Sequence, residues 1–121
     1  MSVLQIAYIG DSVWTLIVRN QLIRKGLNVH HMHTECTNLV NAHAQAGFLR
    51  KIISELTPAE SALVKRGRNA HARHPVPKNQ NPEDYSLATA FEVLIGYLYL
   101  TGNNERIELF TNTIIGGYPN G

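Results

Sequence analysis

Two long stretches of this chain are apolar at nearly every position of a helical wheel, and they limit its fold more than any other feature. The first runs from Val3 to Lys25 and stops before Gly26, and the second runs from Pro82 to about Leu100. A helix that is apolar on all sides is normally buried among other helices. Both stretches are therefore expected to be central helices of one packed core.

Three more helices are predicted around these two. Apolar residues recur at three- and four-residue spacing from near His33 to Glu55, which predicts one helix. The segment Thr57–Glu60 is a capping box with proline at the first helical position, so another helix should begin there. A short last helix is expected from Asn104 to Thr113. Strand signals are poor, and the predicted class is all-α with about five helices.

The length and composition point to one small domain. A chain of 121 residues with 44% hydrophobic residues fits a single core, which we place at residues 1–115, followed by a flexible Gly/Pro-rich tail at 116–121. No apolar run approaches the ~20 residues of a membrane span, and no secretory signal is visible. The single cysteine, Cys36, excludes an internal disulfide and a Cys-rich zinc site. These features predict a cytoplasmic protein without a membrane partner.

Two carboxylates lie in unfavourable surroundings. Asp11 and Glu92 each interrupt one of the two apolar stretches, whereas the other seven acids lie at helix ends or among polar residues. If the two helices cross, these acids come together, and like charges in one place raise a pKa or bind a cation. Magnesium is commonly held by one or two carboxylates with water. The alternative is that each acid meets an arginine or a backbone donor in the core. Gly10, unfavourable within a helix, suggests a close approach beside Asp11.

A basic segment supplies a matching partner surface. No acid occurs between Ser61 and Pro82, and two prolines, Pro75 and Pro77, predict an extended loop within it. Its cations and amides suit phosphate and sugar oxygens, although a merely solvated loop would look the same. The candidate nucleic-acid contacts are Lys65, Arg66, Arg68, Asn69, Arg73, Lys78 and Asn79. Together with the acidic pair, they favour phosphodiester chemistry.

Other catalytic chemistries have weaker support. His30, His31 and His33 cluster, and His43 follows, but the zinc-binding string His-Glu-x-x-His is absent. The serines and Cys36 lie in no recognisable nucleophile motif.

Five short motifs, in order and at compatible spacing over about residues 6 to 110, resemble those of the ribonuclease III family. The middle three resemble specifically its Mini-III branch, which has the nuclease domain without a double-stranded-RNA-binding domain. The motifs are Tyr8–Val13, His33–Ala46, Arg66–Ala70, Val76–Asn79 and Phe91–Leu100.

This resemblance implies a homodimeric, Mg²⁺-dependent endoribonuclease that cuts double-stranded RNA. Asp11 matches the signature aspartate and Glu92 the glutamate of the second acidic motif, so both are expected to be catalytic and to bind the metal. The branch matures the base-paired ends of large-subunit (23S) ribosomal RNA, and a ribosomal protein that presents this RNA is a further candidate partner. Recognition should depend on A-form shape, 2′-hydroxyls and phosphates.

The chain also departs from the larger ribonucleases III at three positions. Leu4, Ala7 and Thr89 stand where those enzymes have carboxylates. This difference favours an alternative, a catalytically weak, helical RNA-binding dimer acting on structured ribosomal RNA. Retention of both Asp11 and Glu92 argues against the alternative, because a pure binder gains nothing from holding repelling acids together.

Overall fold

The computed structural model describes residues 1–70 and 76–116, and this part of the chain is helical without strands. The predicted all-α class is confirmed. Arg73 and most of the predicted tail, residues 117–121, lie outside the described residues. Among the helices in residues 1–70 and 76–116, none combines the length and the hydrophobicity of a membrane span. The helices are α1 (Val3–Arg24), α2 (Val29–Val40), α3 (Ala42–Ile52), α4 (Pro58–Asn69), α5 (Pro82–Leu100) and α6 (Asn104–Ile115), with a short 3-10 helix, η1 (Ile53–Glu55), after α3.

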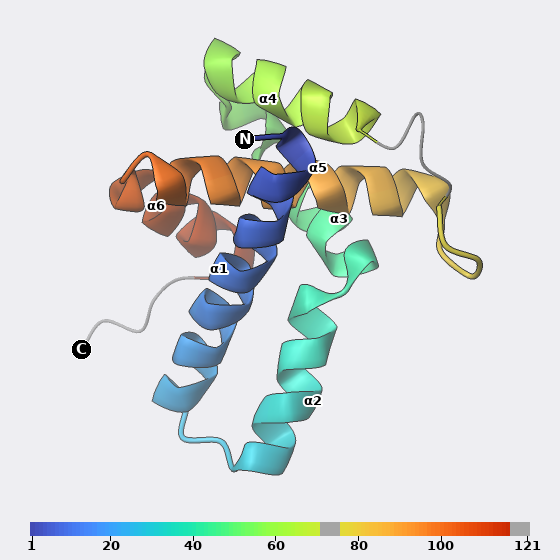
Figure 1. The fold of residues 1–121 in the computed structure, drawn as a ribbon. Coiled ribbons are helices and arrows are strands. Elements are labelled where there is room, and N and C mark those ends of the chain that lie inside the picture. The colour runs from blue at the N-terminus through green and yellow to red at the C-terminus, as the bar shows by residue number, and fades with distance from the viewer. Residues whose placement is uncertain (71–75, 117–121) are drawn as a thin grey trace.

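Helix α5 is the centre of the fold. It contacts α1, α3, α4 and α6 (Figure 1), and Phe91, Leu94 and Ile95 on it are fully buried. The helix starts as expected, with the Asn81 side chain accepting a hydrogen bond from the Asp84 N–H and proline at the first position. The prediction of an apolar, central helix over this stretch is therefore confirmed.

Helix α1 does not fit the same prediction. It crosses α5 and then continues beyond it, where α2 returns alongside (Figure 1). One side stays open: Tyr8 is 77% exposed, Leu16 66% and Ile23 62%. The expectation of burial on every side was wrong, because the remaining helices of this small domain leave part of α1 uncovered.

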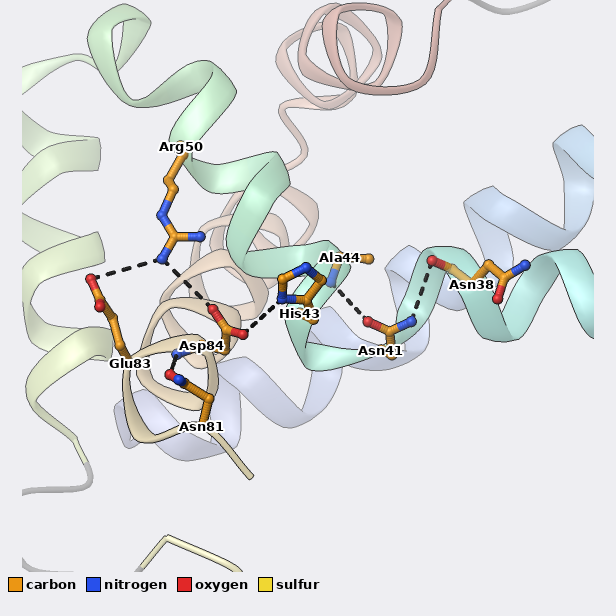
Figure 2. Close-up of polar contacts among 8 residues, drawn as sticks. All are labelled: Asn38, Asn41, His43, Ala44, Arg50, Asn81, Glu83 and Asp84. Carbon is orange, nitrogen blue, oxygen red and sulfur yellow. Dashed lines mark hydrogen bonds and ion pairs between the residues drawn. The ribbon is translucent and has the colours of Figure 1, made fainter. Parts of the chain in front are cut away.

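The predicted helix from His33 to Glu55 is in fact two helices joined at Asn41. The backbone of Asn41 is extended, with ψ of 162°. Its side chain bonds to both helices. Nδ2 donates to the Thr37 carbonyl at 3.1 Å. Figure 2 shows the other two contacts: Nδ2 donates to the Asn38 carbonyl (3.4 Å), and Oδ1 accepts from the Ala44 N–H (2.8 Å). Apolar periodicity continues through this break, which is why it was missed. Because of this break, the described ranges contain six α-helices, where about five were predicted.

Helix α4 begins at the predicted capping box, where hydrogen bonds join it to α6. Glu60 accepts from the Thr57 N–H at 2.8 Å and from Arg106 Nε and Nη2 at 2.9 and 2.8 Å. Arg106 also donates to the carbonyl of Glu55 and lies 4.4 Å from the Phe110 ring centre. These hydrogen bonds from Arg106 lower the pKa of the nearly buried Glu60 carboxyl.

Arg106→Met is expected to lower the free energy of unfolding by ~2–4 kcal/mol at pH 7, because Glu60 would remain almost buried without its cation. A carboxyl with a depressed folded-state pKa stabilises the fold above its unfolded pKa and loses that contribution as pH falls. The difference between wild type and variant should therefore shrink below about pH 4.5, the ordinary pKa of glutamate. Urea unfolding at pH 7 and pH 3.5 measures this. An equal difference at both values would contradict it.

Candidate active site

The candidate site forms where α1 crosses α5 with almost no space between the two backbones. A Cβ atom on Gly10 would overlap the carbonyl oxygen of Glu92 and lie 2.9 Å from the Gly96 nitrogen. A Cβ on Gly96 would likewise overlap the carbonyl oxygen of Ile6. Two glycines thus allow this contact, and the suggestion that Gly10 marks a close approach is confirmed. Asp11, next to Gly10, is thereby placed beside Glu92.

The two carboxylates interact directly, as the sequence predicted. Partial burial raises the pKa of the Glu92 carboxyl to about 8, and a hydrogen bond with Asp11 and the charge of Asp11 act in the same direction. The burial is nevertheless unequal. Asp11 is exposed, contrary to the expectation from its apolar neighbours. Neither acid is paired with an arginine among the described ion pairs.

A pocket of about 310 Å³ opens over these acids, between α1, α3 and α5. We call it the acidic pocket. The three positions at which the sequence lacks expected carboxylates, Leu4, Ala7 and Thr89, all belong to its wall. The pocket is therefore open at the three positions where larger ribonucleases III carry further carboxylates. The other lining residues are Tyr8, Asp11, Val40, Ala42, Gln45, Tyr85, Ala88 and Glu92.

Aromatic packing fixes the α1 wall of the pocket. Trp14, one helical turn after Asp11, is fully buried and donates from Nε1 to the Leu39 carbonyl at 3.0 Å. Its ring meets Phe91, the neighbour of Glu92, edge-on at a centroid distance of 5.0 Å, and Phe48 at 5.6 Å. Each acid therefore lies close in sequence to a buried ring of the same cluster.

Polar contacts fix the α3 wall. Figure 2 shows His43 at the start of α3 reaching Asp84 in the first turn of α5, with Nδ1 and Oδ2 2.8 Å apart. Arg50 Nη2 lies 3.7 Å from Asp84 and 3.8 Å from Glu83. His43 thus contributes to helix packing here, at the edge of the pocket that Ala42 and Tyr85 line.

Gln45 is a pocket residue that was not among the predicted site residues. It is 2% exposed, and its Nε2 atom has no hydrogen-bond partner among the described residues. The sequence carried a signal: Gln45 lies three residues after Ala42 and four before Leu49, so it is a polar residue on the apolar face of its helix. Buried polar side chains are rare without a partner.

The donor set suits a hard divalent cation that keeps much of its water. Two adjacent carboxylates in an open pocket supply oxygen ligands. Burial and the neighbouring Asp11 disfavour the ionised form of Glu92, and a bound cation would offset both effects. The described residues contain no group of three or more His, Cys, Asp or Glu side chains with metal-site geometry. Asp11 and Glu92 would therefore be the protein ligands of such an ion.

The predicted basic contacts lie apart from the acidic pocket. Gly67 packs α4 onto α5 so closely that a Cβ would lie 2.9 Å from the Ala90 Cα. Ala90 is on the opposite side of α5 from Glu92, since residues two apart are about 200° apart around a helix. Lys65, Arg68 and Asn69 line a separate pocket of about 560 Å³. Arg66 is also exposed.

The described part of the predicted extended loop is a tight turn. The Gln80 N–H donates to the Pro77 carbonyl at 3.3 Å, and Asn79 has a positive φ of 72°. Asparagine tolerates this left-handed conformation better than most residues, which explains why the chain turns here. Lys78 and Asn79 are exposed at the turn.

Comparisons with known proteins agree with this architecture. The model of the Ribonuclease III domain matches residues 4–103. Mini-ribonuclease 3 of Symbiobacterium thermophilum is 41% identical over 106 residues, which is 87% of this chain and 81% of that protein. Mini-ribonuclease 3 of Brevibacillus brevis is 45% identical over 105 residues, 86% of this chain and 78% of that protein.

A solved structure shows the same fold. The crystal structure of a Fusobacterium nucleatum protein matches with a TM-score of 0.86 and 31% identity, over 94% of this chain and 91% of that one. The family match covers both acids and the helices that hold them. The chain belongs to the ribonuclease III family, in the branch of the Mini-ribonucleases 3, and it is an endoribonuclease.

Proposed function

We propose that this endoribonuclease cuts double-stranded RNA in a Mg²⁺-dependent reaction at the acidic pocket, with Asp11 and Glu92 as catalytic residues and metal ligands. The observation that carries the proposal is the contact between these two carboxylates at the Gly10–Gly96 crossing. These two adjacent carboxyls cannot both ionise without repulsion, whereas a cation between them stabilises both in the ionised form.

The roles of the two acids follow from their surroundings. In the metal-free protein Glu92 holds a proton at neutral pH, because its pKa is raised to about 8. Asp11, which is exposed, faces arriving substrate. When bound, Mg²⁺ supplies an activated water and charge neutralisation at the phosphate. Asp11 and Glu92 hold and orient that ion.

The direct test is incubation of the protein with a long RNA duplex in Mg²⁺, with and without a chelator. We expect two-strand cleavage that the chelator stops, and products with 5′-phosphate ends. A matched single-stranded RNA is the control and should stay intact. Binding without cleavage at every Mg²⁺ concentration would instead favour the RNA-binding dimer, for which the uncharged positions Leu4, Ala7 and Thr89 are the argument.

We further propose that the natural substrate is the base-paired end region of precursor large-subunit ribosomal RNA in the cytoplasm, and that a ribosomal protein presents that RNA. The relatives' shared name, Mini-ribonuclease 3, supports the branch to which this role belongs. Precursor 23S ribosomal RNA should then be cut at paired positions on its two strands. Cleavage at scattered sites would contradict this substrate.

A second copy of the chain should complete the enzyme. A mostly apolar groove of about 500 Å³ lies along the open side of α1. Its lining residues are Ile9, Ser12, Val13, Leu16 and Ile17 of α1, Tyr99 of α5, and Asn104, Ile107 and Glu108 of α6. Leu16 and Tyr99 in it are 66% and 52% exposed. Large exposed apolar patches mark interfaces, and a symmetric pair would present two acidic pockets to the two strands of a duplex.

Sedimentation at low micromolar concentration is expected to give twice 13.5 kDa. Leu16→Glu should shift the protein toward the monomer, because it puts a charge into the apolar groove, while Glu35→Gln on exposed α2 should leave the dimer unchanged. A monomeric wild type that still cuts both strands at paired positions would contradict the proposal.

The exposed cations should contribute affinity. Arg68 and Lys78 make no ion pair with a described carboxylate, so both are available to phosphates. Changing both to alanine is expected to weaken binding of all duplexes alike and to reduce the slope of log affinity against log salt by about one unit per lost contact. A salt series in Ca²⁺ measures this. Unchanged affinity with a much lower maximal cleavage rate would show that these residues act in the reaction itself.

A further inference from the structure

Gln45 combines burial, an unused hydrogen-bond donor and a place in the wall of the acidic pocket. Its side chain is 2% exposed, and Nε2 has no partner among the described residues. An unpaired buried donor destabilises a fold, so such a group usually meets a water or a ligand. The acidic pocket is the space beside it in which either could be bound.

The backbone around Gln45 is firmly positioned. Its own N–H bonds to the Asn41 carbonyl at 3.0 Å, and two residues earlier His43 attaches α3 to Asp84 of α5. Thr89 across the pocket already donates its hydroxyl to the Tyr85 carbonyl at 3.0 Å. The Gln45 amide therefore offers an unused donor on a fixed helix in the wall of the pocket that the acids also line.

The occupant that best fits this position is water. The pocket, at about 310 Å³, exceeds the ~30 Å³ of one water several times. A Mg²⁺ ion held by two carboxylates keeps several waters, which need polar partners in the wall. A phosphate on a stiff duplex cannot follow Gln45 into its buried position. The last torsion of glutamine is soft, so the amide can turn toward a water without moving α3.

We propose that Gln45 is a positioning residue whose amide hydrogen-bonds a water in the hydration shell of the divalent cation. It does not touch the ion. It supplies an uncharged polar partner in a pocket where Ala7 and Thr89 supply no carboxylate. This inference rests on the proposed function, because it assumes that a cation binds between Asp11 and Glu92.

The test compares Gln45→Met with Gln21→Met. Both replace a buried glutamine by an apolar side chain of similar length, but Gln21 is on α1 and outside the acidic pocket. Mg²⁺ alone is titrated while the melting temperature is followed, since an ion that binds the folded state raises it. Gln45→Met should melt no lower than wild type in chelator and need about tenfold more Mg²⁺ for the same rise, as for one lost hydrogen bond.

One further measurement separates the alternatives. The affinity of Gln45→Met for an RNA duplex without divalent ions should be unchanged. A lower melting temperature with an unchanged Mg²⁺ requirement would make Gln45 a packing residue, and weaker RNA binding with an unchanged Mg²⁺ requirement would make it a phosphate contact. Either result overturns the proposal.

Failure of this inference can be told from failure of the proposed function through Asp11→Asn. If Asp11→Asn keeps both the Mg²⁺-dependent rise in melting temperature and cleavage, the metal site is not there, and both proposals are wrong. If Asp11→Asn loses both while Gln45→Met matches wild type, only the role of Gln45 is refuted. An equal loss of Mg²⁺ response in Gln21→Met would also refute it, because the effect would then not depend on the pocket.

Discussion

Replacing Glu92 by glutamine is expected to lower the cleavage rate of double-stranded RNA about a thousandfold or more and to raise the melting temperature by several degrees at pH 8. The loss of rate reflects the removal of a metal ligand, an effect of ~4 kcal/mol or more on the transition state. The gain in stability reflects the removal of a carboxyl whose ionised form is disfavoured first by burial and then by the neighbouring Asp11.

The pKa of Glu92 determines how the stability difference between wild type and Glu92→Gln changes with pH. The pKa of Glu92 rises from its ordinary value of 4.5 to about 8 in the folded protein. Between these values the folded state binds more protons than the unfolded state, so wild-type stability falls as pH rises, by at most ~1.4 kcal/mol per pH unit from this group. Glu92→Gln should remove that slope. The two proteins should therefore have similar stability near pH 4 and differ most near pH 8.

Thermal unfolding from pH 4 to pH 8, alongside cleavage of a duplex in Mg²⁺, measures both effects. Glu35→Gln, which removes the same charge from an exposed position of α2, should change neither. A Glu92→Gln protein that melts below wild type at pH 8 would show that Glu92 stabilises the fold through a partner and is not a strained member of an acidic pair.

Gly10→Ala is expected to destabilise the protein by more than ~3 kcal/mol and to abolish cleavage. The new methyl group would overlap the carbonyl oxygen of Glu92, and backbone atoms cannot move aside as a flexible side chain can. The helices must separate, which weakens the packing of Trp14 on Phe91 and moves Asp11 from Glu92. A loss of this size is a large share of the ~5–15 kcal/mol that stabilises a typical domain.

Gly47→Ala is the matched control. Gly47 also lies within a helix, α3, but a Cβ there would meet no atom within 4 Å. It should therefore be neutral or stabilising by ~0.5–1 kcal/mol, the usual advantage of alanine over glycine within a helix. Urea unfolding and cleavage assays on the two variants make the comparison. Wild-type stability in Gly10→Ala would mean that α1 and α5 are not in backbone contact.

The features that the sequence predicted correctly depend on local patterns. The capping box at Thr57 marked the start of α4, and Asn81 with Pro82 marked the start of α5, because both act within a few residues. The pairing of Asp11 with Glu92 was also predictable, since each interrupts an apolar stretch and Gly10 indicates a close contact. The long-range part of that prediction required only that the two helices cross.

What the sequence did not reveal depends on solvent exposure and on single side chains. Apolar residues such as Tyr8 and Leu16 look the same in sequence whether they face a core or a partner, so the open side of α1 was not foreseen. Asn41 interrupts a helical pattern whose apolar spacing does not change. Gln45 stands out in the sequence as a polar residue at an apolar helix position, but only its surroundings show that its Nε2 atom has no partner among the described residues.

The backbone contact at Gly10 and Gly96 has a consequence for how this enzyme can evolve. The spacing of α1 and α5 is set by main-chain atoms and two glycines, not by the side chains that surround the pocket. Residues at Leu4, Ala7 and Thr89 can therefore gain or lose charge while Asp11 and Glu92 stay together. The number of acidic ligands becomes an adjustable property on a constant frame, and metal affinity can drift or be engineered without rebuilding the fold.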